Sequence, residues 1–568
     1  NLVFTAIGGT LTAYDSADGR KQWSAPCAES GYKTPPGILV AGGLIWDVDT
    51  GGEPYRPGTD LTKINRYFTG YDPHTGNVVK RLPVSGEHGY AIMHHRCHVP
   101  RASADWIITS FPGIEFFDVN TGSVTHDSWL RGACLYGFLP ANGLIYLPPN
   151  PCACYIRARP TGFWAAAGVR TRPHPLPAEE RLELTAQSLT PTKNPSGSHR
   201  LQVTDADWPT YRGDAARSGW LSAPVSPDLR PLWTATIGPG ATQAVAVADR
   251  VFVATKDDCT VHALDADTGA RLWQTTLGGR IDSPPTYYAG TLLVGSHDGY
   301  VYCLDAETGH LRWRFCAAPI DERCVAYDQV ESVWPVHGSI LVDDDVAWCC
   351  AGRSSYLDGG LWVYRLDAAT GKQLSCTRID TLGPKNEQPP IEPTIFARLE
   401  IDGARNDILS SNGTHVFLRH WTFDRDGRSV SQTVPHLMSP TGFTDDSWFR
   451  RTYWIYGATY VSGAQGWARA GNVCPSGRIL CLTDDRIYGF GRDWYPPSPG
   501  VQHQMYLAGE HERLFSMPKQ TRDVTPETEI VLPKKRKRGE TSSENATTGE
   551  KDVLWTQETG FQVKALLV

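Results

Sequence analysis

A short phrase of residues recurs six times along this chain and constrains its fold more than any other feature. Each copy has an apolar or aromatic residue followed by Asp and, four positions after the Asp, Gly. The copies begin at Tyr14, Tyr71, Phe117, Leu264, Leu304 and Leu366. Asp-x-x-Thr-Gly between alternating apolar runs is typical of a β-hairpin, because Asp can cap the turn and Gly accepts a positive φ. The spacing of 40 to 62 residues between Asp265, Asp305 and Asp367 predicts an array of β-units.

Length and composition agree with one large β-protein. The chain has 568 residues, of which 55 are Gly and 41 are Pro, and this suits many short strands joined by turns. Its 19 Trp and 23 Tyr provide ample material for a hydrophobic core. Because a ring of repeated sheets is one domain at any length, we expect residues 1–568 to form a single domain.

Charge and hydropathy argue against two classes of partner. The net charge is −7 and the pI is near 6.2, whereas a nucleic-acid-binding protein normally presents a basic surface. No run approaches the roughly 18 apolar residues of a membrane span. We therefore expect no nucleic-acid partner and no membrane span. Because the sequence starts at Asn1 without a signal peptide, we expect a mature or excised chain whose targeting is not visible.

The clearest unit covers 281–317 and predicts a four-stranded antiparallel meander. Its expected strands are 283–288, 291–295, 300–304 and 310–315. Units of the same plan are expected near 32–83, 92–129, 131–166, 241–278 and 333–379, the last with an insertion at 352–360. The stretch 393–560 follows the pattern more loosely. We count about eight four-stranded units, which is typical of a β-propeller.

The two ends of the chain complement each other. Residues 2–6 match the second strand of a unit, and the runs containing Tyr14 and Trp23 match the third and fourth. Residues 561–568 at the other terminus supply the missing first strand. We therefore predict an all-β propeller whose ring is closed by N- and C-terminal strands in one blade, since closure removes exposed sheet edges. A chain cut within a sheet of a longer protein would give the same pattern.

Two segments do not follow the repeat. Residues 167–232 are rich in Pro and charge, and we expect them to form a crossover strap over the ring. Residues 517–552 contain the basic run 534–538, Lys-Lys-Arg-Lys-Arg, within a polar stretch. In isolation this run resembles a nuclear signal, but its surroundings favour a solvated loop insertion.

The repeat resembles the PQQ-like (quinoprotein) β-propeller family. The resemblance rests on 264–273 (Leu-Asp-Ala-Asp-Thr-Gly-Ala-Arg-Leu-Trp), on 304–313 (Leu-Asp-Ala-Glu-Thr-Gly-His-Leu-Arg-Trp) and on the lead-in at 207–214. Stretches 129–137 and 450–457 are similar to a bacterial subgroup described only as PQQ-binding-like. The resemblance implies a periplasmic or extracellular location. It also implies a Trp packed between adjacent blades, a role that would fall to Trp23, Trp273 and Trp313.

The resemblance implies two kinds of function. Some members are quinone-dependent alcohol dehydrogenases, in which PQQ lies beside a Ca²⁺ held by Glu and Asn, with an Asp base and an adjacent Cys pair at the quinone. Others bind no cofactor and act as assembly platforms in the envelope. Cys349 and Cys350 are adjacent, but they lie in a strand-like run, and no Glu, Asn and Asp set aligns with the cofactor site. PQQ with calcium is thus implied by the resemblance alone.

Polar clusters at the starts of first strands are the candidate sites, because propellers present functional groups at one mouth of the central channel. The densest cluster is His94-His-Arg-Cys-His98, and further Arg and Tyr residues open later units or lie on the insertion. Arg pairs with carboxylate or sulfate, while His and Tyr exchange protons, so this set suits an acidic glycan. The candidate catalytic residues are His95, Arg131, Tyr136, Arg353, Tyr356 and Arg451.

The first cluster also offers metal ligands. His94, Cys97 and His98 carry imidazole and thiolate donors, which transition metals favour. Neighbouring strand residues point to opposite faces, so at most one of His94 and His95 could join Cys97 without a bulge. On an expected loop, Cys152 and Cys154 could pair, bind a metal or do neither. A structural role, in which Arg and His satisfy channel-facing carbonyls, stays an alternative for the whole set.

Three functional hypotheses stay open. The first is a propeller whose central mouth binds a small-molecule or glycan ligand, with quinone-dependent oxidoreduction as the implied activity. The second is a non-catalytic platform for a protein partner. The third is an acidic-polysaccharide-binding protein or lyase. The sequence contains no phosphate-binding Gly-rich loop, Gly-x-Ser-x-Gly elbow or His-Glu-x-x-His motif that would favour another enzyme class.

Overall fold

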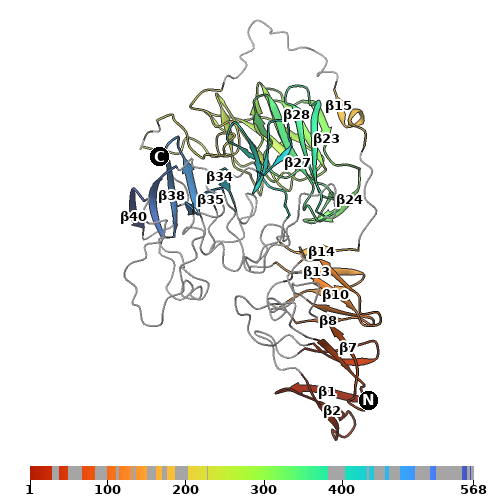
Figure 1. The fold of residues 1–568 in the computed structure, drawn as a ribbon. Helices are drawn as coiled ribbons and strands as arrows, with labels where there is room; N and C mark the ends of the chain where they lie inside the picture. Colours follow the sequence, from red (N-terminus) through yellow and green to blue (C-terminus); the bar gives the residue numbers. More distant parts are fainter. Residues whose placement is uncertain are drawn as a thin grey trace. The chain divides into compact units, whose positions relative to one another are not determined.

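The computed structural model shows a chain built from antiparallel β-sheets (Figure 1). Its described residues are those outside 28–36, 49–66, 84–98, 110–113, 128, 131, 133–135, 150–161, 169–175, 186–202, 225, 227, 382–402, 432–433, 440–453, 459–473, 493–511, 520–552, 560–562 and 564–568. The chain divides into two compact units, one of 1–170 with 392–401 and one of 171–391 with 402–568. Among the described residues, no helix is long and apolar enough to cross a membrane.

The first unit contains four sheets. A three-stranded sheet is formed by β1 (Leu2–Ile7), β2 (Thr10–Asp15) and β3 (Lys21–Pro26). The next has β4 (Gly37–Ala41), β5 (Leu44–Val48), β6 (Tyr67–Tyr71) and β7 (Val78–Pro83). The third has β8 (Arg101–Ala102), β9 (Trp106–Thr109), β10 (Ile114–Asp118) and β11 (Val124–Asp127). The fourth has β12 (Leu139–Ala141), β13 (Leu144–Leu147) and β14 (Trp164–Ala166).

The second unit begins with its most regular sheets. One has β16 (Val245–Val247), β17 (Arg250–Thr255), β18 (Thr260–Asp265) and β19 (Arg271–Thr276). The next has β20 (Thr286–Tyr288), β21 (Thr291–Gly295), β22 (Tyr300–Asp305) and β23 (Leu311–Cys316), with β15 (Leu182–Leu184) added beside β23 (Figure 1). A third has β26 (Leu341–Asp343), β27 (Val346–Ala351), β28 (Leu361–Asp367) and β29 (Gln373–Ile379).

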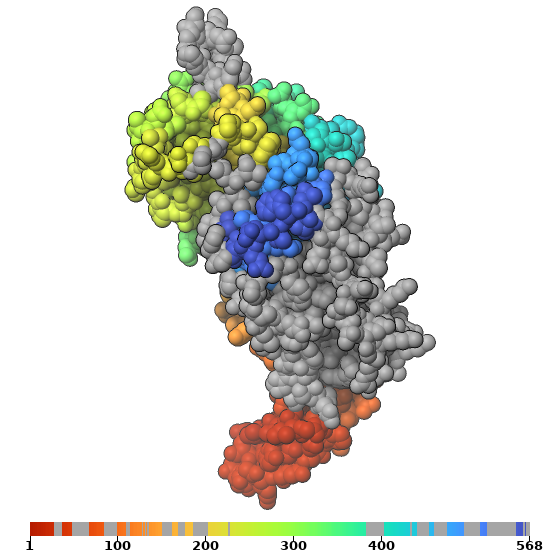
Figure 2. All heavy atoms as spheres, turned by 90° about the vertical axis from the view of Figure 1, so that its left-hand side faces the viewer, coloured from red at the N-terminus to blue at the C-terminus, as the bar shows by residue number. Residues whose placement is uncertain are grey.

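The rest of the second unit holds three more sheets and a hairpin among its described residues. One sheet has β30 (Ser410–Ser411), β31 (Val416–Leu418), β32 (Trp421–Phe423) and β33 (Ser429–Val430), and another has β34 (His436–Met438), β35 (Trp454–Gly457) and β36 (Ser476–Gly477). The last has β37 (Ile479–Leu482), β38 (Arg486–Arg492), β39 (Glu512–Pro518) and β40 (Trp555–Thr559). Figure 2 shows the atoms of β37–β40, from lighter to darker blue along the chain, as one contiguous group. A separate hairpin consists of β24 (Arg323–Ala326) and β25 (Gln329–Ser332).

The strands predicted for the clearest units are confirmed. In the unit at 281–317, the four strands β20–β23 pair in sequential antiparallel order. The unit at 241–278 forms β16–β19, and that at 333–379 forms β26–β29 with its insertion between β27 and β28. The first sheet has three strands, as expected of a unit that lacks its first strand.

The repeated Trp and Gly join neighbouring sheets. The indole nitrogen of Trp273, on β19, donates a hydrogen bond to Ala306 O at 3.2 Å in the next repeat turn. The same ring covers that turn so closely that a Cβ on Gly309 would lie 2.5 Å from it. Trp313 repeats the contact on Gly371, and Trp23 repeats it on Gly76. The Trp packing implied by the resemblance is therefore present.

Buried side chains fill the space between neighbouring sheets. Phe252 of β17 stacks on Tyr287 of β20, with ring centroids 6.4 Å apart. Phe315 of β23 meets Tyr364 of β28 edge-on at 5.2 Å. Alternate residues of a strand face opposite sides, so each sheet contributes one face to each of two cores. The sheets β16–β19, β20–β23 and β26–β29 therefore pack face to face in chain order.

One segment joins the first strands of five sheets. Residues 207–220, which we call the inner segment, lie within the predicted strap. They hydrogen-bond the first strand, or a residue up to two positions before it, in the sheets whose edge strands are β16, β20, β26, β30 and β37. The contacted residues are Ala246, Tyr287, Ser339, Ser411 and Leu482. Because each of these strands is the edge of its own sheet, the inner segment covers five sheet edges.

The blade count and ring closure predicted from the sequence are not settled by these sheets. The described residues form ten sheets of three to five strands and one two-stranded hairpin, so a count of eight is not confirmed. The closing strand predicted at 561–568 lies outside the described residues except for Val563. The polar insertion at 517–552 is likewise outside them except at 517–519, which end β39 and continue just beyond it.

Candidate functional site

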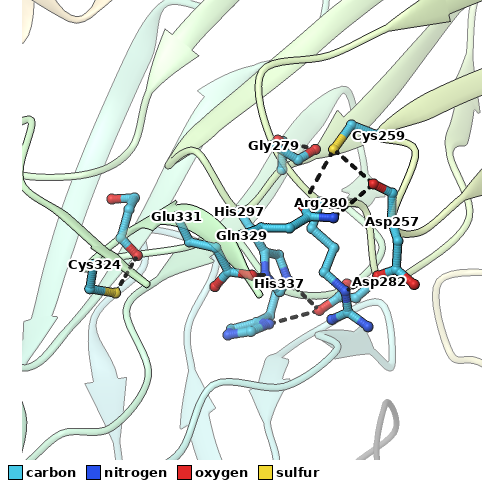
Figure 3. A network of polar contacts seen from close by, with 12 residues as sticks. Asp257, Cys259, Gly279, Arg280, Asp282, His297, Cys324, Gln329, Glu331 and His337 are labelled. Carbon is cyan, nitrogen blue, oxygen red and sulfur yellow. Dashed lines mark hydrogen bonds and ion pairs between the residues drawn. The ribbon is translucent and has the colours of Figure 1, made fainter. Parts of the chain in front are cut away.

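Five charged or titratable side chains meet beside the sheets β20–β23 and β26–β29, and Figure 3 labels four of them, Asp282, His297, Glu331 and His337. Asp282 and His337 lie in the loops that lead into β20 and β26, each four residues before the strand. His297 lies in the turn between β21 and β22, and Glu331 belongs to β25. Arg353 lies on the insertion after β27. We call these five residues the carboxylate–histidine cluster.

The Asp282 carboxylate is the centre of the cluster. Its Oδ2 accepts hydrogen bonds from His297 Nε2 at 3.0 Å and from His337 Nδ1 at 2.7 Å. Its Oδ1 accepts from the Gly338 amide at 2.9 Å and the Ser283 hydroxyl at 3.0 Å. Both oxygens are therefore held, and Oδ2 is directed at two imidazoles at once.

A second carboxylate holds His297 from its other side. His297 Nδ1 lies 2.8 Å from Glu331 Oε1, and Glu331 Oε2 accepts from Arg353 at 2.7 Å. Arg353 also donates to the carbonyls of Ser332 and Val333 at 2.9 and 2.7 Å. The side chains of Glu331 and His297 are 0% and 1% exposed, so these charges are shielded from water and their pairing is obligatory.

The hydrogen bonds decide the charge on each group. Burial would raise the pKa of Asp282, but hydrogen bonds from both histidines hold it well below its usual value. Burial would raise the pKa of Glu331 too, and its contacts with His297 and Arg353 lower it. For His297, burial favours the neutral form, yet its two carboxylate partners raise the pKa. Burial and the charge of His297 lower the pKa of His337. The cluster therefore alternates anion and cation, with His337 neutral.

His337 is the member most open to solvent. Its side chain is 19% exposed, against 8% for Asp282. Its ring meets that of His297 edge-on, with centroids 4.5 Å apart. Tyr327, at the tip of the β24–β25 hairpin, lies 6.5 Å from His297 by ring centroids, and Arg280 stacks on the Tyr327 ring at 4.3 Å. The cluster is thus reachable through His337 and bordered by an aromatic side chain.

Of the candidate residues named from the sequence, Arg353 belongs to this cluster. Tyr356 lies on the same insertion, where its amide donates to Ser354 Oγ at 3.3 Å. Tyr136 belongs to the other unit, and its side chain is exposed. The remaining candidates lie outside the described residues, and so do Cys152 and Cys154. Those candidates are His94, His95, Cys97, His98, Arg131 and Arg451.

Sequence reasoning missed four of the five cluster residues. His297 was assigned to a turn with Asp298 and Gly299, and turns are ordinarily polar without a further role. Asp282 and His337 carried a usable signal, because they occupy the same position ahead of the first strand in successive repeats. Aligning the repeats on their strands and comparing that position would have selected both. No comparable sequence signal marked Glu331, since it lies on the β24–β25 hairpin, which interrupts the repeat.

The described residues do not fit the quinone site that the resemblance implies. Cys349 and Cys350 are both buried in β27, at 3% and 1% exposure. As neighbours on a strand they face opposite sides, and they belong to two different inter-sheet cores. A quinone could not contact the pair there. The cluster's donors are two imidazoles and carboxylates, whereas Ca²⁺ is bound by oxygen ligands.

The donor types of the cluster suit two kinds of chemistry. His337 could accept or release a proton with Asp282 fixing its ring, which is the usual arrangement for general acid–base work. Alternatively, the ligand atoms of Asp282, His297 and His337, which all lie within 4.8 Å of one another, could hold a metal ion. Both uses depend on the same Asp282 oxygen.

The antiparallel repeats and their Trp–Gly contacts show that the described residues form a series of similar β-sheets. Residues 219–375, which carry the cluster and the sheets β16–β23, match the PQQ-repeat family model described as "Outer membrane protein assembly factor BamB". The resemblance to the PQQ-like repeat family is therefore confirmed.

One curated relative is the outer membrane protein assembly factor BamB of Burkholderia pseudomallei (strain K96243). It is 27% identical over 143 residues, which cover 17% of this chain and 37% of the relative. The chain therefore spans well under half the length of the curated relative that it matches.

Two solved structures are similar over different shares of the chain. BamB from Moraxella catarrhalis has 13% identity and a TM-score of 0.22, covering 86% of this chain and 92% of that one. The quinohemoprotein alcohol dehydrogenase from Comamonas testosteroni has 22% identity and a TM-score of 0.25, covering 30% and 27%. At TM-scores this low, neither structure decides how the sheets of this chain are arranged.

Proposed function

We propose that this chain is a non-catalytic protein-binding platform of the bacterial envelope. Its partner would be a protein of the outer-membrane assembly machinery, the kind of process named for the matching family and curated relative. The observation that carries the proposal is the β24–β25 hairpin, which stands apart from the larger sheets (Figure 1). Three large apolar or aromatic side chains are exposed on it, namely Val325 at 77%, Tyr327 at 66% and Val330 at 62%.

The hairpin is built to present these side chains. Val325 and Val330 lie directly opposite each other, so both branched side chains share one face. The two turn residues, Tyr327 and Asp328, have φ of 52° and 60°, a conformation that hairpin turns usually give to Gly or Asn. Holding non-Gly residues there costs about 1–2 kcal/mol each. Strain of this kind is retained where a loop has a function.

Tyr327 has the composition and setting of an interface anchor. Arg280 stacks on its ring and is itself fixed by Asp257 at 2.9 Å, so the aromatic side chain is oriented before a partner arrives. Aromatic and Arg residues dominate binding energy at protein interfaces, and orienting them in advance lowers the entropy lost on binding. We infer an apolar, extended or loop segment of the partner as the occupant of this face.

Photo-crosslinking in cells tests the proposal. A benzophenone side chain at Val325 or Val330 should crosslink to an outer-membrane assembly protein identified by mass spectrometry. The matched control is Leu374 on β29, which is 47% exposed in the same unit and should give no such product. The proposal fails if the hairpin and Leu374 positions give the same products, or if the hairpin gives none.

A double substitution measures the contribution of the hairpin face. Val325→Asp with Val330→Lys should weaken binding of the crosslinked partner at least tenfold, because two charges replace the apolar pair at the interface, and their opposite signs avoid repulsion across the hairpin. Each tenfold change in affinity corresponds to about 1.4 kcal/mol. Since both positions are exposed, the melting temperature should stay within a degree or two of the parent. Unchanged affinity with unchanged stability would contradict the platform role of this face.

The finer architecture belongs to the same proposal. We propose that residues 1–568 form one propeller of about eight blades, with 561–568 pairing beside β1 to close the ring. In the part of the chain that the structure describes, the sheet β1–β3 has three strands where a full unit has four, and this supports the proposal. Cysteine pairs introduced between 2–6 and 563–567 should form disulfides within one chain under mild oxidation. Failure of every pair in folded protein would exclude closure by these strands.

Ligand binding at a central mouth is a separate proposal, with His95, Arg131, Tyr136, Arg353, Tyr356 and Arg451 as its residues. Quinone-dependent oxidation and action on acidic polysaccharides are its two forms. Reconstitution with PQQ and Ca²⁺, followed by dye reduction with an alcohol, tests the first. Release of an unsaturated product from an acidic polysaccharide, lost on His95→Ala or Tyr136→Phe, tests the second.

A further inference from the structure

Three metal-type donor atoms converge in the carboxylate–histidine cluster from separate parts of the fold (Figure 3). They are Asp282 Oδ2, His297 Nε2 and His337 Nδ1, and all lie within 4.8 Å of one another. They come from two loops that enter successive sheets and from one turn between strands. No local sequence pattern requires these three atoms to lie close together. Their proximity results from the packing of the two sheets.

Two of the three donors are held by further polar partners. Glu331 accepts from the opposite nitrogen of His297 and is fixed by Arg353. The second oxygen of Asp282 is held by the Gly338 amide and the Ser283 hydroxyl. A metal-binding histidine nearly always donates its other N–H to a carboxylate or carbonyl, which fixes its tautomer and orientation. His297 has that arrangement with Glu331 already in place.

The backbone around His297 is also fixed. Its amide donates to Arg280 O at 2.9 Å, and its carbonyl accepts from the Ser332 amide at 2.8 Å. The amide of Val336 donates to Ser296 O at 3.1 Å, which ties the His337 loop to the same turn. The three donors are therefore carried by hydrogen-bonded backbone and not by freely moving loops.

The distances require only a small adjustment to admit an ion. Tetrahedral zinc with bonds of about 2.0–2.2 Å places its ligand atoms about 3.3–3.5 Å apart. Asp282 Oδ2 lies 3.0 Å from His297 Nε2 and 2.7 Å from His337 Nδ1. A metal therefore requires the first contact to open by about 0.3–0.5 Å and the second by about 0.6–0.8 Å, with the two nitrogens already within 4.8 Å of each other. Rotation of the His337 ring, whose side chain is partly exposed, supplies most of that movement.

An ordinary buried ion pair explains less of the geometry. A structural pair between Asp282 and His297 would need no second imidazole on the same oxygen, yet His337 is there at 2.7 Å. Two imidazoles and one carboxylate are the donors of catalytic zinc sites and of non-haem iron sites, which keep positions open for solvent. The partial exposure of His337 leaves a route for that solvent.

We propose that Asp282, His297 and His337 form a binding site for a divalent transition metal of the zinc type, with Glu331 and Arg353 as positioning residues. Binding of the ion releases the proton of His297 Nε2 to solvent and leaves His297 neutral, and the hydrogen that His337 carries on Nδ1 shifts to Nε2 through exchange with solvent, which frees the Nδ1 lone pair. Three protein ligands leave at least one coordination position for water. The site shares β25 with the hairpin through Glu331, but metal binding is measured without any protein partner, so its test does not depend on the docking role of the hairpin.

Cobalt titration of the full chain, stripped with a chelator, tests the site. Co²⁺ bound by two imidazoles and a carboxylate gives visible d–d absorption without the intense near-ultraviolet bands of thiolate ligation. His337→Ala should abolish that absorption, and Glu331→Gln should weaken Co²⁺ binding about 10- to 100-fold, as expected for a residue that orients a ligand. His310→Ala, an exposed histidine on a repeat turn, is the matched control and should bind as the parent does.

Two further measurements keep the outcome decisive. The triple variant His94→Ala, Cys97→Ser, His98→Ala removes the other predicted metal set and should leave the absorption intact. X-ray absorption of the unsubstituted zinc-loaded chain should show two imidazoles and no sulfur in the first shell. The proposal is overturned if Co²⁺ absorption survives both His337→Ala and Asp282→Asn, or disappears in the triple variant. Sulfur ligation of the zinc, or failure of the unsubstituted chain to bind Co²⁺, would also overturn the proposal. Both results are obtained without the variants and do not depend on whether the variants fold.

Discussion

The repeated Asp acts as a cap for its own turn. Asp265 Oδ1 accepts from the amide and hydroxyl of Thr268 at 2.8 and 2.7 Å, while its carbonyl accepts from the Gly269 amide at 2.9 Å. Asp72, Asp118 and Asp305 make corresponding contacts. Gly269 completes the turn with a φ of 71°, which a branched residue would resist. The five residues from Asp to Gly thus fix the hairpin turn through contacts among themselves.

The cap should make part of the stability dependent on pH. Hydrogen bonds from the Thr268 hydroxyl and amide lower the pKa of Asp265. Its contribution is therefore present above the unfolded pKa of about 3.9 and is lost as pH falls through the lower folded value. We expect Asp265→Ala to lower the melting temperature at pH 7, and Asp265→Asn, which keeps an acceptor, to lower it less. The difference in free energy of unfolding between the parent and Asp265→Ala, measured by urea unfolding, should narrow below about pH 4. A difference that stays constant with pH would contradict the capping role of Asp265.

At the scale of elements, the contact between a Trp and the next turn's Gly sets the spacing of neighbouring sheets. Trp273 reaches Gly309, Trp313 reaches Gly371, and Trp233, which the sequence reading did not single out, reaches Gly269. The indole nitrogen of each donates to a backbone carbonyl of the turn that it covers. The ring thus supplies both buried area and a directional bond, and a side chain on the Gly would occupy the same space.

Gly309→Ala tests this contact. The new Cβ would lie 2.5 Å from the Trp273 ring, and the φ of 74° is unfavourable for Ala. We expect a loss of about 2–5 kcal/mol in the free energy of unfolding, combining backbone strain with overpacking. Gly413→Ala is the control, because its φ is 83° but no atom lies within 4 Å of its Cβ. Gly413→Ala should lower the free energy of unfolding by only about 1–2 kcal/mol. Equal losses for the two variants would show that the Trp273 ring can move aside at little cost.

The elements also show why the fold was easier to predict than the site. Strand β22 is visible in the sequence because 300–304 form a short apolar run that ends at the Asp of the repeat turn, and both signals are local. The cluster depends on His297 and His337 coming together across 40 residues, through packing of two sheets that no local pattern describes. Arg353 was found because it lies on an insertion that departs from the repeat. Glu331 was not, because the hairpin that carries it has no counterpart in the other units.

At the scale of the whole molecule, the second unit is organised around the inner segment 207–220. Arg217 in that segment is 0% exposed and donates to backbone carbonyls of Leu409, Tyr211 and Ser339. Burial lowers the pKa of Arg217 to about 10, which still leaves it charged at neutral pH. Its guanidinium thus connects residues just before β26 and β30 to the inner segment. The five sheets share no strand pairing with one another. Hydrogen bonds to the inner segment therefore link their edge strands.

Arg217→Ala should therefore loosen several sheets at once. It leaves the carbonyls of Leu409 and Ser339 without their buried donor, at about 1–3 kcal/mol for each unsatisfied group. By hydrogen exchange, we expect faster exchange at the amides of Ser411 and Leu482, which donate to the inner segment, than at amides within the β21–β22 pairing. Arg428→Ala, whose side chain is 74% exposed, is the control and should cost at most about 1 kcal/mol. Faster exchange at Ser411 alone would mean that the edge strand of each sheet is stable without the others. The inner segment would then not be needed to stabilise the five sheets together.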